Sequence, residues 1–327
     1  MNNIKILVTG VTGFIGSHLA LELTKRKHEV YGLIKHVPSR ELRLFTEFLN
    51  DVTLVNGDIT SYLSVTNAIK SINPDVVVHL AALSPVRLSF ERPFEFMQAN
   101  LIGTMNVAHS MLDLPDFKSR RLIVASTAEV YGIQKEHPVK EEGTLSPSSP
   151  YAVSKAAVDM YARMMIEGYG LNATVIRATN SYGRKFDAGF VIEYLVTEML
   201  KGKKIYVGAP DSIRDYMYVD DHVNAYILAI EKEEAQKDIF NVSTEGGITN
   251  KELALKIAEK TNFDKNNIVF GSYPPNYPHR PLVSDQPFIL LDSTKIKTKL
   301  GWRQTVSLDE GLGRVIEYWS KAVNRFK

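Results

Sequence analysis

The first 130 residues of the chain alternate short apolar runs with longer stretches of mixed polarity. Runs of Val, Ile and Leu without polar alternation are typical of strands that are covered on both faces. Strands that alternate with helical patterns predict right-handed parallel crossovers. We expect strands at residues 4–8, 30–34, 52–56, 76–80 and 122–125, and helices at 14–25, 65–71 and 100–112.

The second half of the chain has a different pattern. Prolines gather between residues 274 and 287, and helical patterns occur at 251–261 and 308–321. The length of 327 residues, at about 150 per domain, also suggests two domains. The sequence therefore predicts an α/β protein with a doubly wound parallel sheet of the Rossmann type and a smaller mixed α/β lobe. We expect the sheet domain at residues 1–177 and about 217–245, and the lobe at 178–216 and 246–327.

Composition and charge exclude several classes of protein. Apolar residues make up 44% and charged residues 23%, which is ordinary for a globular protein and unlike a disordered, collagen-like or coiled-coil chain. Lys and Arg number 39 against 37 Asp and Glu, so there is no basic excess to neutralise a nucleic acid backbone. The absence of cysteine excludes disulfides, thiolate zinc sites and a cysteine nucleophile, and it fits a reducing compartment.

The chain shows no signal for export, membrane insertion or metal binding. Residues 1–10 read as a strand rather than a signal peptide. The longest apolar run, around 76–83, is far short of the ~20 residues that a membrane helix needs. The eight histidines show no HExxH spacing. We therefore expect a cytoplasmic protein with no metal, no membrane contact and no nucleic acid partner.

Three glycines, Gly10, Gly13 and Gly16, follow the first predicted strand and open the first predicted helix. Glycine lets the backbone turn tightly and approach a pyrophosphate closely, and the helix N-terminus offers N–H groups to the phosphates. The spacing is GxxGxxG, whereas the usual dehydrogenase fingerprint is GxGxxG. A tight strand-to-helix turn needs glycine in any case, but the position in the first βα turn predicts a dinucleotide site.

The end of the second predicted strand bears on which dinucleotide binds. A carboxylate there would bond the 2′-hydroxyl of NAD, whereas a basic residue favours the 2′-phosphate of NADP. This strand ends in Lys35 and His36, with Arg40 close behind and no carboxylate at its tip. The sequence favours NADP over NAD, although a solvated basic edge would explain the same residues. Asp58, after the third strand, is placed to accept the adenine amino group.

The pattern Tyr-x-x-x-Lys occurs three times, and its context distinguishes one copy. The copies at Tyr31 and Tyr131 lie along a predicted strand and in a glycine-containing loop, whereas Tyr151 and Lys155 open a helix behind a serine cap and a proline. Residues four apart share one helix face, so the ammonium can favour the phenolate. The pKa of a tyrosine, about 10, has to fall by several units for a base near neutrality. We expect Tyr151 to be this base.

Two hydroxyl residues, Ser126 and Thr127, follow the fifth predicted strand. They lie at the carboxyl edge, where doubly wound folds bind ligands. A hydroxyl there can bond the substrate oxygen that Tyr151 deprotonates. A strand-end turn would explain Ser126 equally well.

Further motifs accompany these residues: 149–155 (SPYAVSK), 80–82 (LAA), Asn100 with Gly103 and Thr104, 177–183 (RATNSYG), 214–221 (RDYMYVDD) and 300–302 (LGW). With them the chain resembles the extended short-chain dehydrogenase/reductase superfamily, and in particular its nucleotide-sugar epimerases and dehydratases. The resemblance covers nearly the whole chain. It implies an NAD(P)-dependent enzyme that acts on a nucleotide-diphosphate sugar.

The resemblance also implies residue roles. Thr127, Tyr151 and Lys155 would form the redox triad. The expected cofactor-binding residues are Gly10, Thr12, Gly13, Phe14, Ile15, Gly16, Lys35, Asp58, Ile59, Leu80, Ala81, Ala82, Asn100, Tyr151 and Lys155. The expected substrate-binding residues are Ser84, Val86, Ser126, Asn180, Val207, Arg214 and Arg280. Of these, Asn180, Arg214 and Arg280 fall where the family holds the diphosphate, which two guanidinium groups and an amide suit. A local ion pair with Asp215 is the alternative for Arg214.

Members of this family first oxidise the sugar at C4, and an additional base separates their reactions. A C4 epimerase turns the keto sugar over and returns the hydride, whereas a 4,6-dehydratase removes the C5 proton and eliminates water from C6. Glu129 is the candidate base, and a carboxylate bonded to backbone at a strand end is its alternative role. Ala128 stands where glucose-type dehydratases have an aspartate, and the segment 84–90 resembles the mannose type.

The sequence thus favours a GDP-sugar 4,6-dehydratase, with GDP-mannose 4,6-dehydratases as the nearest resemblance. A C4 epimerase of the UDP-glucose 4-epimerase type is the second hypothesis. A 4-keto-sugar reductase, a decarboxylase and a non-catalytic NAD(P)-binding regulator are further ones. A regulator would be expected to have a broken tyrosine–lysine pair, and here the pair is intact.

The predicted helix at 151–169 is apolar around most of its circumference, with Met160 and Met164 among its residues. One interpretation is a core helix sandwiched by the second lobe. The other, which the resemblance supports, is a homodimer formed by this helix and residues 100–112 with their symmetry mates, or a tetramer built from such dimers.

Overall fold

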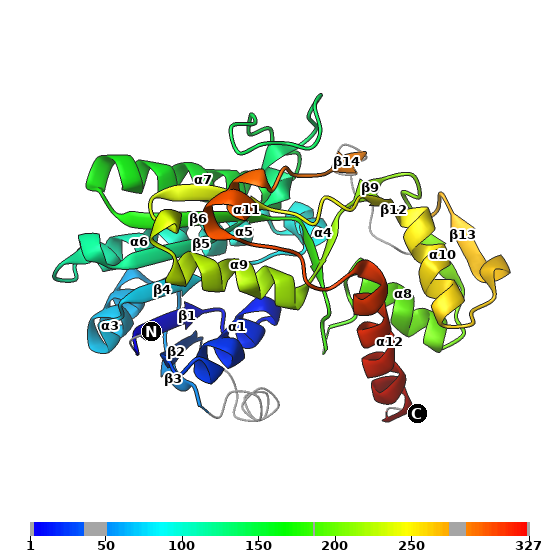
Figure 1. Ribbon diagram of the computed structural model, residues 1–327, viewed down its shortest axis with the longest axis horizontal. Helices are drawn as coiled ribbons and strands as arrows, with labels where there is room; N and C mark the ends of the chain where they lie inside the picture. Colours follow the sequence, from blue (N-terminus) through cyan, green and yellow to red (C-terminus); the bar gives the residue numbers. More distant parts are fainter. Residues whose placement is uncertain (1–2, 36–50, 186, 275–285, 326–327) are drawn as a thin grey trace.

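The computed structural model describes residues 3–35, 51–185, 187–274 and 286–325 (Figure 1). Its main element is a parallel seven-stranded sheet with the order β11-β6-β5-β4-β1-β2-β3. The strands are β1 (Lys5–Thr9), β2 (Glu29–Ile34), β3 (Thr53–Asn56), β4 (Val76–His79), β5 (Arg121–Thr127), β6 (Asn172–Ala178) and β11 (Asp238–Val242). The order reverses between β1 and β4, which confirms the doubly wound sheet.

Helices cover both faces of this sheet because alternate residues of each strand face opposite layers. On β1, Ile6 and Val8 join the core under one pair of helices, whereas Leu7 joins the core under the other set. The first pair is α1 (Phe14–Lys25) and α9 (Val219–Glu231). The second set is α3 (Tyr62–Ile72), α6 (Gly103–Leu112) and α7 (Pro150–Tyr169).

The chain before α6 is more complex than the single helix expected at 100–112. It forms α4 (Val86–Glu91), α5 (Pro93–Phe96) and the π-helix η1 (Met97–Ile102). Three short 3₁₀ turns, η2 (Phe117–Ser119), η4 (Glu233–Ala235) and η5 (Lys265–Asn267), lie elsewhere. A fourth, η3 (Ala128–Tyr131), directly continues β5 and carries Glu129.

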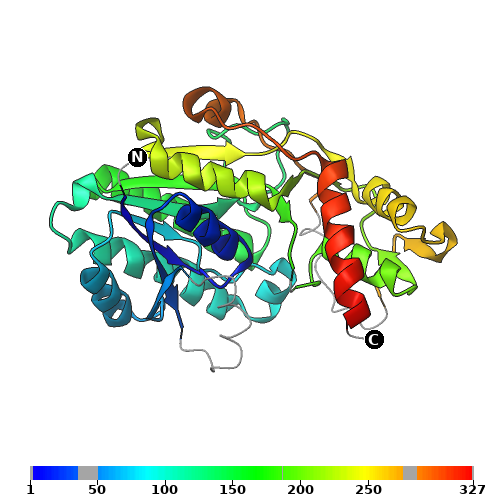
Figure 2. The same ribbon diagram turned by 60° about the horizontal axis from the view of Figure 1, so that its bottom comes forward.

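A second apolar cluster lies to one side of the sheet, as the red helix α12 with α8 and α10 in Figure 2 shows. Its helices are α8 (Val191–Leu200), α10 (Asn250–Lys260) and α12 (Leu308–Arg325), and they enclose β8 (Ile205–Val207) paired with β13 (Ile268–Phe270). Leu195, Ile257 and Leu312 are fully or almost fully buried at its centre. This is a mixed α/β arrangement.

Short strands link the two clusters. β7 (Asn180–Tyr182) pairs with β10 (Tyr216–Tyr218), and β9 (Ile213–Arg214) pairs with β12 (Ile248–Thr249) and β14 (Phe288–Ile289). After them, α11 (Thr294–Leu300) returns to the sheet. The indole of Trp302 donates to the carbonyl oxygen of Asp221 at 2.9 Å, and the Asp221 carboxylate accepts from the backbone N–H of Thr305 at 2.8 Å. These contacts fix the return of the chain against α9.

Candidate active site

The carboxyl ends of the parallel strands lie at one edge of the sheet, and the predicted site residues follow them. Gly10 follows β1, Lys35 follows β2, Leu80 follows β4 and Thr127 ends β5. In open α/β sheets the crevice outside this edge binds ligands. The fold therefore brings together residues that lie far apart in the sequence.

The turn between β1 and α1 requires glycine. Gly10 has a left-handed φ of +71°, and a Cβ there would lie 2.7 Å from the amide nitrogen of Ala81. A Cβ on Gly16 would lie 2.1 Å from the carbonyl oxygen of Gly10. α1 begins behind Gly13 without a side-chain cap and without an acidic residue in its first turn, so its N–H groups suit an anion. The turn also contains the half-buried residues Thr12, Phe14 and Ile15.

Arg184, which the sequence analysis did not single out, packs on this turn. Its guanidinium carbon lies 4.3 Å from the ring centre of Phe14 and 3.5 Å from that of Phe190. The buried carboxylate of Glu193 accepts from the backbone N–H of Arg184 at 2.9 Å. Cation–π packing of this kind joins the glycine turn to the start of α8. No local sequence pattern indicates such a contact, because its partners come from distant segments.

At the end of β2, the predicted basic residue already has a partner. Lys35 Nζ lies 2.8 Å from Asp58 Oδ2, although the Lys35 side chain is 73% exposed. Burial raises the pKa of Asp58, but the hydrogen bonds from Lys35 and Thr60 outweigh it and the pKa is lowered overall. Next to them, the carbonyl oxygen of Ile59 accepts from Asn106 Nδ2 at 2.8 Å. His36 and Arg40 lie outside the described residues.

A chain of buried polar groups supports the loop after β4. Thr104 Oγ1 donates to the carbonyl oxygen of Asn100, so it accepts from His79 Nε2, at 3.1 Å. His79 Nδ1 then accepts from Thr9 Oγ1 at 2.8 Å, and Thr9 Oγ1 in turn accepts from the backbone N–H of Ala81 at 3.1 Å. Burial, with the charge of Lys155, lowers the pKa of His79 to about 3, so the ring is neutral. Sequence reasoning missed Thr9 and His79, although polar residues in otherwise apolar strands were a usable signal.

Asn100 fixes the same loop from the other side. Its Oδ1 accepts from the backbone N–H of Leu83 at 2.8 Å, and its Nδ2 donates to the carbonyl oxygen of Leu83 at 3.0 Å and to Ser154 Oγ at 2.8 Å. The amide is almost fully buried. It therefore ties the loop that contains Ala81 and Ala82 to the helix that carries the tyrosine–lysine pair.

Tyr151 lies in the first turn of α7, where the sequence predicts it. Ser149 caps the helix by accepting from the backbone N–H of Ala152 at 3.1 Å, and Pro150 is the first helical residue. Burial raises the pKa of Tyr151, a hydrogen bond with Thr127 opposes the rise, and the charge of Glu129 adds to it. The pKa is therefore raised, whereas the sequence analysis expected the lysine to lower it, because burial of the phenol cannot be seen in the sequence.

Lys155 lies one helical turn further along and is also buried. Its Nζ donates to the carbonyl oxygen of Ala125 on β5 at 2.9 Å. Burial lowers the pKa of Lys155 to about 8. Lys155 therefore still carries its proton at neutral pH, but it loses that proton at a lower pH than an ordinary lysine does.

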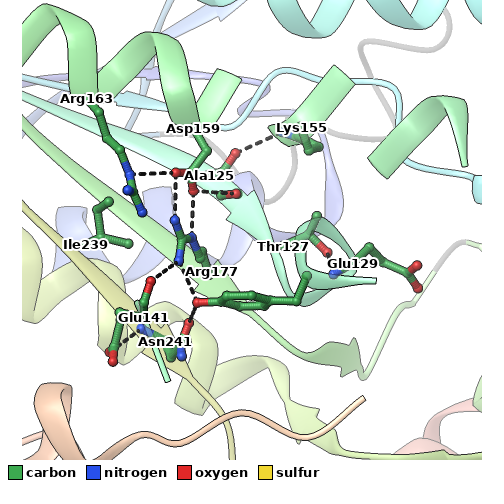
Figure 3. Close-up of polar contacts among 12 residues, drawn as sticks. Ala125, Thr127, Glu129, Glu141, Lys155, Asp159, Arg163, Arg177, Ile239 and Asn241 are labelled. Carbon is green, nitrogen blue, oxygen red and sulfur yellow. Dashed lines mark hydrogen bonds and ion pairs between the residues drawn. The ribbon is translucent and has the colours of Figure 1, made fainter. Parts of the chain in front are cut away.

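The end of β5 separates its two hydroxyl residues. Thr127 faces Tyr151, and its Oγ1 also accepts from the backbone N–H of Glu129 at 3.3 Å. Ser126 Oγ donates to Asp159 Oδ2 at 3.3 Å, so the structure directs it toward a carboxylate on α7. The Glu129 side chain extends away from that carboxylate (Figure 3) and accepts from Gln286 Nε2 at 3.0 Å.

A second polar cluster surrounds Asp159 (Figure 3). Arg177 binds both oxygens of Asp159, each at 2.7 Å, and both side chains are fully buried. Arg177 Nη1 also donates to the Tyr131 hydroxyl at 2.5 Å and to the Glu141 carbonyl oxygen at 2.8 Å. The Tyr131 hydroxyl donates to Asn241 Oδ1 at 2.7 Å. Tyr131 is thus part of a structural network.

The predicted substrate residues follow β4, β6 and the short strands. Arg214 is almost fully buried on β9, where its Nη1 donates to the carbonyl oxygen of Ile213 at 2.9 Å. The neighbouring Asp215 carboxylate accepts from Thr179 at 2.7 Å and from Ser243 at 2.6 Å. The remaining positions are Ser84 and Asn180, which are exposed, Val86 at the start of α4, and Val207 at the end of β8. Arg280 lies outside the described residues.

Within the ranges described above, no helix combines the length and the apolar character that a membrane span requires. In the same part of the chain, no group of three or more histidine, aspartate or glutamate side chains is arranged to hold a metal ion.

Comparison with known families gives one match that covers most of the chain. The family model described as GDP-mannose 4,6 dehydratase matches residues 7–315. Among curated proteins, the probable dTDP-glucose 4,6-dehydratase of Sinorhizobium fredii is 29% identical over 96% of this chain and 92% of its own. The UDP-glucose 4-epimerase of Mycolicibacterium smegmatis is 31% identical over 96% of this chain and 98% of its own.

Solved structures show the same two activities. A UDP-glucose 4-epimerase of Thermotoga maritima, solved with UDP-glucose, is 31% identical and has a TM-score of 0.86 over 98% of this chain and all of its own. A dTDP-glucose 4,6-dehydratase of Streptomyces venezuelae, solved with NAD and TYD bound, is 27% identical and has a TM-score of 0.86 over 98% of each chain.

Proposed function

Because the chain belongs to the nucleotide-sugar 4,6-dehydratases and 4-epimerases of the extended short-chain dehydrogenase/reductase type, we propose that it is a 4,6-dehydratase of a nucleoside-diphosphate sugar. The observation that carries the choice is Glu129. Its carboxylate is close enough to raise the pKa of Tyr151 and belongs to the same strand end as Thr127. A carboxylate beside the phenol gives the site the additional base that dehydration needs.

The turn after β1 fits a nicotinamide dinucleotide. The glycines have no side chains, so a ligand can approach the backbone of this turn closely. The first turn of α1 has neither a side-chain cap nor an acidic residue. We propose that the set from Gly10 to Gly16, Asp58, Ile59 and the loop at 80–82 hold the cofactor, with Asn100 fixing that loop. NADP is favoured because the exposed Lys35 would meet a 2′-phosphate. Such a cofactor supplies the hydride acceptor and a positive charge that favours the phenolate.

In this proposal Tyr151 accepts the proton of the C4 hydroxyl. The hydrogen bond with Thr127 lowers the pKa of the phenol, and Lys155 holds a positive charge one helical turn away. Because burial raises the pKa of Tyr151, the resting side chain is the neutral phenol. Turnover therefore depends on the charge that ligands bring to the site.

Glu129 then removes the C5 proton, which the C4 ketone makes acidic, and the C6 hydroxyl leaves as water. A leaving hydroxyl needs a proton. Ala128 is buried and has no proton to give. The proton that Glu129 takes from C5 is therefore the one delivered to the C6 oxygen. The hydride removed from C4 would then return to C6, and Glu129 would pass a solvent proton to C5, which gives the C6 methyl group.

We assign the sugar nucleotide to the strands and loops beside this carboxylate. Arg214 would meet the diphosphate, and Asn180 would support it. The family resemblance alone gives Arg280 a place beside them. Ser84, Val86 and Val207 complete the proposed substrate set, whereas the predicted Ser126 directs its hydroxyl to Asp159 instead. We also propose that residues 1–177 and about 217–245 bind the cofactor, while 178–216 and 246–327 bind the sugar nucleotide. The GDP-sugar preference rests on the family model and on the resemblance of residues 84–90 to the mannose type.

The reaction is tested with GDP-mannose, dTDP-glucose and UDP-glucose in heavy water, each with NAD and with NADP, and NMR analysis of the products. We expect a 4-keto product with a methyl group at C6 and deuterium at C5, and Glu129→Gln to abolish it. An inverted C4 without solvent label would show an epimerase instead. The two 31%-identical relatives are epimerases, so this is the second candidate function.

We propose further that the chain forms a homodimer through α7. This helix packs on the sheet by one face, while Val153, Met160 and Met164 on its outer face are 44%, 62% and 39% exposed. Their spacing places them on one side of the helix, so they form an apolar stripe that a second copy would cover. Sedimentation should show a dimer for the native chain and a monomer for Met160→Glu.

A further inference from the structure

Gln286 joins the two segments that flank the proposed catalytic groups. Its side chain is fully buried. Its Nε2 donates to Glu129 Oε2 at 3.0 Å and to Ser148 Oγ at 3.2 Å. Glu129 lies in the turn after β5, and Ser148 lies just before α7. One amide therefore connects the end of β5 with the start of α7.

The backbone around Gln286 is anchored on the substrate side. The next residue, Pro287, accepts from the backbone N–H of Ile213 at 2.9 Å, and Phe288 and Ile289 pair with Ile213 and Arg214. The amide therefore reaches Glu129 from the segment just before β14, 157 residues away in the sequence. Gln286 itself lies two residues before β14, and its side chain is enclosed by the surrounding protein.

From this geometry we infer that Gln286 is a positioning residue that holds the Glu129 carboxylate for proton transfer at the sugar, an inference that rests on the proposed function. A carboxylate only accepts hydrogen bonds, so the amide nitrogen faces it. The hydrogen bond fixes the Oε2 atom of the carboxylate. Displacement of a catalytic group by about 1 Å can cost two orders of magnitude in rate.

An amide also suits a group that changes protonation state. Among the described residues, Gln286 Oε1 has no hydrogen-bond partner although it is buried. When Glu129 carries the proton from C5, its hydroxyl is a donor, and rotation of the Gln286 amide would offer it Oε1 as acceptor. The same side chain thus matches both forms of Glu129, which neither a lysine nor a second carboxylate would do.

The test separates proton abstraction from the oxidation that precedes it. Gln286→Met keeps the length of the side chain but removes the donor, and Gln286→Glu keeps its shape but sets two acceptors against each other. For both variants we expect deuterium incorporation at C5 from heavy water to fall about ten- to hundredfold. The rate of oxidation at C4 is measured as the absorbance of the reduced nicotinamide in a single turnover. It should stay within about twofold of the native rate, so reduced cofactor accumulates.

The matched control is Gln304, whose Nε2 donates to the carbonyl oxygen of Val306 at 2.8 Å, outside the site. Gln304→Met and Gln304→Glu should leave both rates unchanged. If both Gln286 variants exchange C5 at the native rate, or if oxidation and exchange fall together, the positioning role is overturned. If the native enzyme itself incorporates no deuterium at C5, the proposed function fails first, and the inference falls with it.

Discussion

Two clusters of polar residues, one around Asp159 and one around Tyr151, lie on strand β5 and helix α7. They differ in how their buried charges are paired. Around Asp159, the buried carboxylate has a matched partner, because Arg177 binds both of its oxygens. Around Tyr151, the Lys155 ammonium donates to the neutral carbonyl oxygen of Ala125 and has no carboxylate partner among the described residues, and the buried phenol lies near the charge of Glu129. The first cluster holds the helix against the sheet, whereas the second keeps groups whose protonation can change.

The pKa values express this difference. In the Asp159 cluster, burial alone would lower the pKa of Arg177, but Asp159 and Tyr131 raise it, so the guanidinium stays charged. In the Tyr151 cluster, burial raises the pKa of the phenol and lowers that of Lys155 to about 8. A buried ionisable side chain with an oppositely charged partner keeps its charge and helps to hold the fold. Without such a partner, its pKa shifts and it can exchange a proton.

The largest expected effect is on turnover by the Tyr151 cluster. Tyr151→Phe removes the hydroxyl that accepts the C4 proton, so we expect turnover to fall by about 10⁴-fold. The measurement is product formation by NMR with the preferred nucleotide sugar. A thermal melt close to that of the native chain serves as the control for folding. Turnover near the native rate would show that Tyr151 does not accept the C4 proton. The proposed difference between a catalytic and a structural cluster would then be wrong.

The next effect is on stability in the Asp159 cluster. Arg177→Met leaves a fully buried carboxylate without its partner, and we expect the free energy of unfolding in urea to fall by about 3–5 kcal/mol. The double variant Arg177→Met with Asp159→Leu should regain much of this loss, because no buried charge remains. A single variant as stable as the native chain would show that the pair is not a structural anchor.

The smallest effect is a pH dependence caused by Lys155. Its pKa is about 8 in the folded chain against 10.5 for an ordinary lysine, so below pH 8 the charged form destabilises the fold by up to about 3 kcal/mol. Between pH 8 and 10.5 the unfolded chain binds more protons, and native stability rises with pH. Lys155→Met should therefore be more stable than the native chain at pH 7, with an advantage that shrinks toward pH 10.5.

Urea unfolding of both chains at pH 7 and pH 10 measures this effect. The difference between the two chains cancels the contribution of the other titrating groups. The lost hydrogen bond to Ala125 reduces the advantage at both pH values. An advantage that does not change with pH would show that the lysine is not destabilised by its charge.

Local patterns predicted much of the fold and part of the candidate site. The apolar runs predicted the first five strands because strands covered on both faces need no polar alternation. The glycine turn and the Tyr151–Lys155 pair were visible because each is a contiguous motif in one element. Strand β11 lacks such a run, since it contains Asp238 and the buried Asn241.

The rest depends on contacts that no local pattern contains. Asn241 is 110 residues from Tyr131, and Gln286 is 157 residues from Glu129. The direction of the pKa shift of Tyr151 depends on burial by distant elements. A sequence shows that a tyrosine and a lysine share a helix face, but it does not show how little water reaches them.

The buried chain from Thr9 through His79 to Thr104 has a consequence for how the enzyme responds to acidity. With a pKa of about 3, His79 keeps one tautomer across the range in which most enzymes work. The donors and acceptors beneath the Ala81 loop therefore never reverse direction as the solution becomes more acidic or more basic. The support beneath the loop therefore keeps its charge across that range, and His79 adds no pH dependence of its own to catalysis there.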